Sequence, residues 1–322
     1  MRFLRSEEQR QLAATVHELL SDADVPAAIR AWGAGEPGPG LEVVRRLAKV
    51  GVAGLAVPER FGGLGADPVD LVVVFEELGR HAVPGPLAES FAAVPALLTG
   101  LGDDVAGRWL PQLATGDRPA SLAMPPHVPY ALDADVAAPV FVVDGDRVGL
   151  AAYFGLASSV DASRRLGAVD GTDLVADGPS VAPAAARAFE AGVLCCAAQL
   201  LGLGRGLLEQ ATAYVRQRRQ FGRAIGEFQA VKHHLADVLV ALEFARPLVH
   251  AAAVTGAPRD VSAARVAAAD AAYRAARAAL QVHGAVGYTL EYDLGLWLTK
   301  VRALRSAWGT QSWHRDRVLA AL

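Results

Sequence analysis

Residues 214–237 read YVRQRRQFGRAIGEFQAVKHHLAD, and this stretch is the most informative part of the chain. Within it, Arg218-Arg219-Gln220-Phe221-Gly222 follows an amphipathic helical pattern. A guanidinium at a helix end is a fixed cationic fork that suits a pyrophosphate. Phe221 offers a ring face, and Gly222 lets the backbone approach a ligand closely. Taken alone, these residues fit a helix end with surface arginines better than a ligand site.

Three further segments belong to the same family pattern as residues 214–237. Gln281-Val282-His283-Gly284 lies near the end of a later helical pattern, and a glycine-rich loop reads VPERFGGLG at residues 57–65, before EELG at 76–79. Together with residues 214–237, these segments resemble the acyl-CoA dehydrogenase family over nearly the whole chain. That family oxidises acyl-CoA thioesters with FAD: a glutamate removes the α-proton while a β-hydride passes to the flavin.

The resemblance implies a set of cofactor-binding residues. In the family, the arginine and phenylalanine of R-x-x-F-G and the Q-x-x-G segment contact the ADP side of an FAD held mainly by a neighbouring subunit. The matching residues here are Arg218, Phe221, Gln281 and Gly284, and Gln229 aligns with another position near the cofactor. Ala285 stands where the family usually has a second glycine, which adds a methyl near the phosphate contact.

The position of the catalytic base departs from the family. Members commonly carry the base in a Y-E-G-T stretch, where this chain reads Ala307-Trp308-Gly309-Thr310, and an indole cannot take a proton from carbon. Other members place the base near the start of the first long helix of the C-terminal domain, and this position aligns around Gly192. Glu190 is the nearest acid, but two residues along a helix turn by about 200°, so we expect Glu190 to point away.

A third departure lies in the loop that covers the flavin ring and substrate in the family. Its T-E-P-x-x-G-S-D pattern aligns with Ser121–Tyr130, where the acid, glycine and serine are missing. The resemblance therefore implies a non-catalytic subunit, without a catalytic residue of its own. Its partner would be a homologous subunit with the catalytic glutamate, as in the α2β2 enzymes that dehydrogenate steroid side-chain CoA thioesters in actinobacteria.

Two other interpretations remain open from the sequence. One is a self-sufficient homomeric flavoenzyme that uses a relocated base such as Glu190. The other is a scaffold or ligand-binding protein that keeps the fold without flavin. Flavin content and the effect of Glu190→Gln distinguish these interpretations.

The fold class follows from three zones that differ in hydrophobic periodicity, helical in the first and third and strand-like in the second. We expect an α-helical N-terminal domain at residues 1–118, a shortened β module at 119–183, and a C-terminal four-helix bundle at 184–322. This is the architecture that the family resemblance implies. The bundle would carry both the oligomer contacts and the FAD contacts.

Hydrophobic periodicity and turn residues predict the individual elements. In the first zone, helices are expected over Leu12–Leu20, around Leu41–Ala48, and after Asp67-Pro68. In the second, strands flank an Asp144-Gly145 hairpin, and Gly167–Gly171 is expected to be another turn. In the third, helices are expected over about 185–217, 229–254, 261–283 and 293–305.

Composition limits the class of protein. The net charge of −3 over 322 residues gives no indication of a nucleic-acid partner. The N-terminus has early charges and no apolar core, so no signal peptide is expected, and the apolar stretch Ala191–Leu203 is shorter than a membrane span. The adjacent Cys195 and Cys196 suit a reducing compartment and helix packing. We expect a cytoplasmic protein.

Two other motifs have simple structural interpretations. Adjacent histidines on a helix, His233 and His234, diverge by about 100° and do not readily share a metal ion. Gly202-Leu203-Gly204-Arg205-Gly206 imitates a nucleotide-binding loop, but it lacks the last glycine and the strand–turn context. We therefore expect no metal site at the histidines and close helix packing at the glycines.

Overall fold

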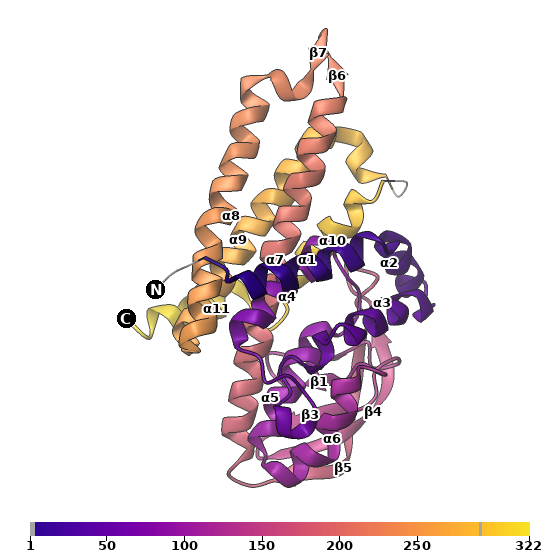
Figure 1. Ribbon diagram of the computed structural model, residues 1–322, viewed down its shortest axis with the longest axis vertical. Helices are drawn as coiled ribbons and strands as arrows, with labels where there is room; N and C mark the ends of the chain where they lie inside the picture. The colour runs from indigo at the N-terminus through magenta and orange to yellow at the C-terminus, as the bar shows by residue number, and fades with distance from the viewer. Residues whose placement is uncertain (1–3, 290–291) are drawn as a thin grey trace.

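The computed structural model describes residues 4–289 and 292–322. Helix α7 (Val181–Gln217) runs through most of the length of the molecule and joins its two ends (Figure 1). The N-terminal helices and a β-sheet pack around its first half. Two long helices, α8 (Gln229–Thr255) and α9 (Pro258–His283), lie along its second half and carry the hairpin β6–β7 at their far end.

The N-terminal region consists of helices whose starts follow ordinary capping rules. Ser6 and Gln9 form a reciprocal capping box at the start of α1, and Asp24 caps α2. The helices predicted over Leu12–Leu20, around Leu41–Ala48 and after Asp67-Pro68 are present, whereas α2, α5 and α6 were not predicted. The helices are α1 (Glu7–Ser21), α2 (Val25–Gly33), α3 (Gly38–Lys49), α4 (Pro68–Arg80), a π-helical turn (Glu89–Ala93), α5 (Val94–Gly100) and α6 (Asp103–Thr115), with 3₁₀ turns at Val52–Gly54 and Glu59–Phe61.

A five-stranded sheet forms the β module, in the order β1-β3-β4-β5-β2. Only the β1–β3 pair is parallel among the described strands. The Asp144-Gly145 hairpin is confirmed, because Asp144 pairs with Arg147. The strands are β1 (Ser121–Ala123), β2 (Ala131–Leu132), β3 (Val140–Asp144), β4 (Arg147–Ala157) and β5 (Leu166–Asp177).

The turn predicted at Gly167–Gly171 is wrong, because these residues belong to β5. A Cβ at Gly167 would lie 2.5 Å from the Cβ of Ala134, and one at Gly171 would lie 3.0 Å from Val142. The glycines therefore allow close packing inside a strand, which is the other common reason for glycine in a sheet.

The C-terminal region contains the predicted helices and one more. Gly256 ends α8 in a left-handed conformation and Pro258 opens α9, as predicted from the Gly-Ala-Pro break. The short α10 packs against α7 and α9, and α11, which was not predicted, packs against α9. The remaining elements are β6 (Arg219–Gln220), β7 (Arg223–Ala224), 3₁₀ turns at Ile225–Glu227 and Gly284–Tyr288, α10 (Leu294–Leu304) and α11 (Gln311–Leu319).

Glycines let α4 and α7 pack backbone to backbone. A Cβ at Gly202 would lie 2.8 Å from the backbone nitrogen of Arg80, and one at Gly206 would lie 2.5 Å from the Arg80 carbonyl oxygen. On α4, Gly79 faces the backbone of Gln199 in the same way. The Gly202–Gly206 string is thus a helix-packing motif, as expected.

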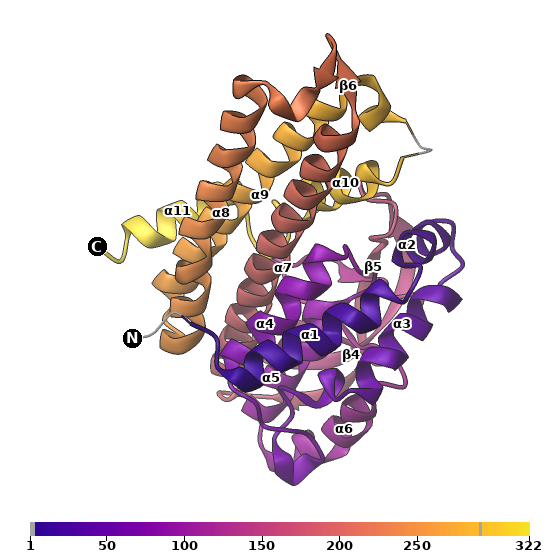
Figure 2. The same cartoon turned by 45° about the horizontal axis from the view of Figure 1, so that its top comes forward.

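Two helices, α7 and α8, are long and apolar enough to cross a membrane by length and composition alone. The apolar window of α7 is 83% buried, including Cys195 and Cys196, so it is a core helix with packed cysteines. The window of α8 is only 39% buried. Seen from the angle of Figure 2, α8 lies on the outer side of the bundle.

Candidate functional site

The motif around Arg218 forms the tip of the molecule. Arg218 caps the end of α7, and β6 and β7 form a two-residue hairpin beyond it, at the top of Figure 1. The central residues Phe221 and Gly222 have φ values of +53° and +81°, which is the pattern of a type I′ turn. This conformation is ordinary for glycine but costs a residue such as phenylalanine about 1–2 kcal/mol.

The strained turn presents Phe221 to solvent. Its side chain is 89% exposed, the second-highest value among the large exposed hydrophobic residues after Leu322. Beneath it, Phe228 packs edge-on at 6.2 Å between ring centroids, and the Arg223 guanidinium lies 4.1 Å above the Phe228 ring. The hairpin therefore places an exposed aromatic ring beside cationic side chains.

The other cofactor-binding candidates lie at the same end of the bundle. Gln229 begins α8 and Gly284 ends α9, and both are exposed. Gly284 has φ +63° and ψ −139°, a backbone conformation that essentially only glycine adopts, while the space around its Cα is open. The glycine of Q-x-x-G is therefore required here by the backbone.

Gln281 lies in a groove of about 680 Å³ between α8 and α9. Two arginines, Arg274 and Arg277, line this groove with Gln281 and His234. They are one helical turn apart on α9, so they place positive charge on the same face as Gln281. Neither arginine was predicted as a site residue, although Arg274, Arg277 and Gln281 have the i, i+3 and i+7 spacing of one helix face.

The two positions where the family resemblance places a base meet in space. Trp308 is 3% exposed, and a Cβ at Gly192 would overlap its indole ring, so the indole fills the space above Gly192. Trp308 has φ +57°, and its carbonyl oxygen accepts a hydrogen bond from His314 Nε2 at 2.9 Å. His314 thus holds the Trp308 backbone, while the indole is buried against Gly192.

Glu190 faces a different part of the molecule. Its carboxylate forms an ion pair with Arg317, which also donates to Ser262 Oγ at 3.3 Å. The pair lies at the edge of an apolar cavity of about 570 Å³ between α7, the N-terminal helices and the α8–α9 turn. The ion pair with Arg317 already occupies the Glu190 carboxylate, so the geometry does not favour Glu190 for proton abstraction.

A second cavity, of about 390 Å³, contains Trp308 and a buried acid that sequence analysis missed. His127, Val128, Pro129 and Tyr130 form one wall, so the segment aligned with the family's flavin loop does line a cleft. Glu89, in the π-helical turn, lies opposite and is 3% exposed. Burial raises the pKa of Glu89 to about 7, and the Arg164 charge offsets only part of this effect.

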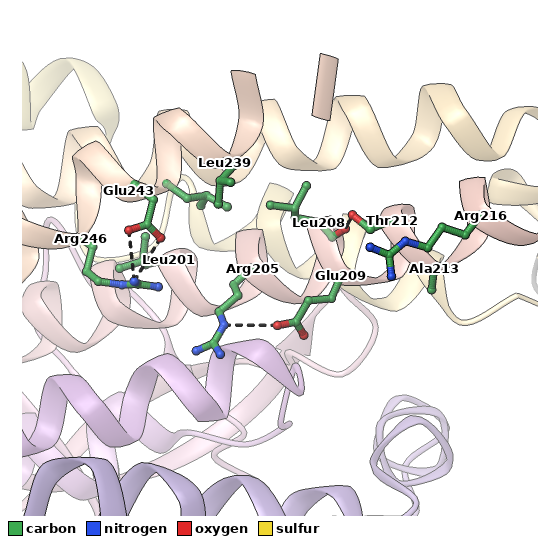
Figure 3. A pocket seen from close by; sticks show the side chains of 11 residues that line it. Leu201, Arg205, Leu208, Glu209, Thr212, Ala213, Arg216, Leu239, Glu243 and Arg246 are labelled. Carbon is green, nitrogen blue, oxygen red and sulfur yellow. Dashed lines mark hydrogen bonds and ion pairs between the residues drawn. The ribbon is translucent and has the colours of Figure 1, made fainter. Parts of the chain in front are cut away.

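The groove between α7 and α8 has an apolar floor and paired charges at its rim. Figure 3 shows Leu201, Leu208 and Leu239 in this groove. At its rim, Arg205 Nε lies 3.3 Å from Glu209, and Arg246 Nη1 lies 3.1 Å from Glu243. The groove therefore offers a packing surface without an unpaired reactive group on these rim residues.

One trio of potential metal ligands, His17, Glu77 and His81, occurs in the described ranges 4–289 and 292–322. Arg80 Nη1 lies 3.1 Å from His17 Nδ1 and 3.3 Å from the Glu77 carboxylate. Burial, with the charges of His17 and Arg80, lowers the pKa of His81 to about 4. This arrangement fits an ion-pair network between α1 and α4, because a guanidinium already neutralises the carboxylate. His233 and His234 are both exposed on α8.

Family models match both helical parts of the chain. The description "Acyl-CoA dehydrogenase, N-terminal domain" matches residues 6–117, and "Acyl-CoA dehydrogenase, C-terminal domain" matches residues 182–322. The chain is 33% identical to acyl-CoA dehydrogenase IpdE2 of Mycobacterium tuberculosis (strain ATCC 25618 / H37Rv), over 91% of each chain. It is also 33% identical to IpdE2 of Mycolicibacterium smegmatis (strain ATCC 700084 / mc(2)155), over 92% of each chain.

Solved structures show the same fold. The chain matches a chain of the ChsE4–ChsE5 complex from Mycobacterium tuberculosis with a TM-score of 0.86 and 23% identity, over 99% of this chain and 98% of that one. It matches glutaryl-coenzyme A dehydrogenase with a TM-score of 0.85 and 22% identity, over 99% and 96%. The expected fold, with N-terminal helices, a small β module and a C-terminal helical domain, is confirmed. From the family models and the IpdE2 relatives, the chain belongs to the acyl-CoA dehydrogenase family.

Proposed function

We propose that this chain is the non-catalytic subunit of a heteromeric, FAD-dependent acyl-CoA dehydrogenase. The observation that carries the proposal is the contrast between two regions. The hairpin tip keeps an exposed ring and cationic groups outside the chain's own core, where a neighbouring subunit can reach them. At the family's base position, a buried indole has replaced the carboxylate and closes the space above Gly192.

In this proposal, Arg218, Phe221, Gln229, Gln281 and Gly284 hold the ADP half of an FAD that the partner subunit houses. The residues suit that group: guanidinium groups match a pyrophosphate, an exposed ring matches a planar base, and an amide offers a donor and an acceptor. Arg274 and Arg277 add positive charge beside Gln281. Bound FAD supplies the hydride acceptor for α,β-dehydrogenation of the acyl-CoA.

The relatives support a substrate class and a kind of partner. One structure with 23% identity and a TM-score of 0.82 is described as a Tcur3481–Tcur3483 steroid ACAD, and both it and the ChsE4–ChsE5 structure contain two different subunits. We propose a steroid side-chain CoA thioester as substrate and a homologous, glutamate-bearing subunit as partner, in the cytoplasm. Within this chain, the proposed domain boundaries remain 1–118, 119–183 and 184–322.

The stoichiometry of flavin tests the proposal. The chain is purified alone and together with a homologous subunit from a neighbouring gene, and flavin per chain is measured by absorbance. We expect little flavin on the chain alone and FAD in the complex. One tightly bound FAD on each isolated chain would favour a self-sufficient enzyme, and a colourless complex would favour a flavin-free scaffold.

A matched pair of arginine variants tests the site itself. Arg218→Ala in the complex should lower flavin retention, because removing one partner of a desolvated Arg–phosphate pair costs on the order of 2–5 kcal/mol. Arg259→Ala is the control, since Arg259 is a half-exposed arginine beside the α8–α9 turn, away from the hairpin. Equal flavin content in the two variants would contradict the role of Arg218.

A further inference from the structure

The cavity beside Trp308 contains groups that the proposed function does not use. It lies between the π-helical turn, the loop at residues 127–132, the segment before β5 and the end of α10. Trp308 and aliphatic side chains such as Leu132, Val160 and Leu166 supply apolar walls. Its volume of about 390 Å³ falls in the range of small-molecule sites.

Arg164 brings a positive charge to this cavity without an ion pair inside the described part of the chain. Two acids on which the charge of Arg164 acts, Asp133 and Asp161, are already engaged by other groups. Asp133 accepts hydrogen bonds from Trp32 Nε1 at 3.0 Å and from the Arg165 backbone at 3.1 Å. Asp161 is paired with Lys300 at 2.9 Å. The Arg164 guanidinium is therefore available to a ligand in the cavity.

Glu89 is the acid that faces the cavity, and it does not neutralise Arg164 by direct contact. Because burial raises its pKa to about 7, much of Glu89 is protonated at neutral pH and offers an O–H donor. Arg164, the residue's own backbone N–H and the Trp308 side chain each lower that pKa, while Asp133 raises it. Among the described lining residues, the cavity thus presents Arg164 and protonated Glu89 as donors and no fully ionised acid at or below pH 7.

We propose that this cavity binds a small molecule with a carboxylate on an apolar body, held by the Arg164 guanidinium and the proton of Glu89. Arg302 and His127 add donors on the cavity wall, and Trp308 covers the apolar part of the ligand. The cleft in which the indole has replaced the family's base is then a binding site. This inference goes beyond the proposed function and does not depend on flavin.

Binding depends on pH through Glu89. Below pH 7 the protonated acid donates to the ligand, and above pH 7 its carboxylate repels the ligand carboxylate, so affinity falls as pH rises. The other titratable groups around Glu89 are His127 and Tyr130 across the cavity, Asp133 from the β module, and Cys195 and Cys196 on α7. Burial raises the pKa of both thiols, so they remain neutral over this range.

Titration calorimetry with octanoate tests the proposal on the full chain, in its complex where one forms. We expect one octanoate per chain at pH 6, at least tenfold weaker binding at pH 8, and at least tenfold weaker binding of octanamide at pH 6. Arg164→Gln should weaken octanoate binding at least tenfold, and Arg164→Lys should recover part of it. Glu89→Gln keeps a donor, so it should bind with little change between pH 6 and 8.

Arg187→Gln is the matched control, because Arg187 lines the separate apolar cavity beside Glu190. If Arg187→Gln weakens octanoate binding and Arg164→Gln does not, octanoate occupies that other cavity and the proposal is wrong. The proposal also fails if octanamide binds equally well, or if His127→Gln rather than Glu89→Gln removes the pH dependence. Flavin content should be unchanged in Arg164→Gln, so failure of the proposed FAD role is recognised separately.

Discussion

At the scale of single residues, the unfavourable backbone conformation of Phe221 indicates a candidate functional position. A bulky residue at positive φ is a true conformational outlier, and here no buried contact compensates for it, since the ring is 89% exposed. Strain of this kind persists where another requirement outweighs it. We infer that the requirement is a contact made outside this chain.

Replacing Phe221 with asparagine should therefore separate stability from function. Asn-Gly is the preferred pair for a type I′ turn, so Phe221→Asn should stabilise the chain by about 1 kcal/mol. The same variant should retain less flavin in the complex, because the ring is lost. Urea unfolding of the purified chain measures the first effect, and flavin absorbance measures the second.

Gly222→Ala gives the opposite test in the same turn. A Cβ there meets no atom within 4 Å, so any loss of stability comes from the positive φ alone. If Phe221→Asn fails to stabilise while Gly222→Ala destabilises, the strain assigned to Phe221 does not exist.

Some residues of the candidate sites were predictable from sequence and others were not. Trp308 and Gly192 are 116 positions apart, yet motif alignment identified both, and they touch in the structure. Glu89 could not be identified in this way. Its raised pKa results from burial among segments that are distant in sequence, and the residues next to Glu89 in the sequence do not indicate that burial.

At the scale of elements, the long helices were predicted, and several short helices were missed for different reasons. The stretch from Glu89 to Leu98 is buried almost throughout, so it has no polar face and no helical period to detect. Helix α6 contains Gly107 and Pro111, which usually argue against a helix. Gly167–Gly171 was misread for a related reason: a glycine needed for close packing looks the same in sequence as one needed for a turn.

The packing of α4 against α7 predicts opposite results for one substitution at two helical glycines. Helix propensity alone predicts that Gly→Ala stabilises a helix by up to about 1 kcal/mol. At Gly202 a methyl would collide with the α4 backbone, so Gly202→Ala should destabilise the protein by about 1–3 kcal/mol or more. At Gly295 in α10 no atom of the described residues lies within 4 Å of the added carbon, so Gly295→Ala should be neutral or stabilising. Thermal unfolding of both variants decides this, and similar melting shifts would refute the close contact.

At the scale of the whole molecule, family motifs in order predicted the fold better than periodicity did. The zones of helix, sheet and helix follow from that resemblance, and the structure has them in the same order. The assembly could not be predicted from pattern alone. An apolar face on a long helix looks the same in sequence whether the chain's own core or another subunit covers it.

The outer face of α8 is where we expect another subunit to pack. Val240, Phe244 and Leu248 are four residues apart on one side of the helix, and they are 52%, 75% and 44% exposed. Leaving this stripe in water is unfavourable at roughly 25 cal/mol per Å² of apolar surface, so a partner surface should cover it. Phe244→Lys should then reduce the mass of the complex measured by sedimentation, because an unpaired charge at the interface costs several kcal/mol. Phe154→Lys is the control, since Phe154 is 74% exposed on β4, away from α8. A complex of unchanged mass for Phe244→Lys, or equal dissociation of both variants, would exclude α8 as the interface.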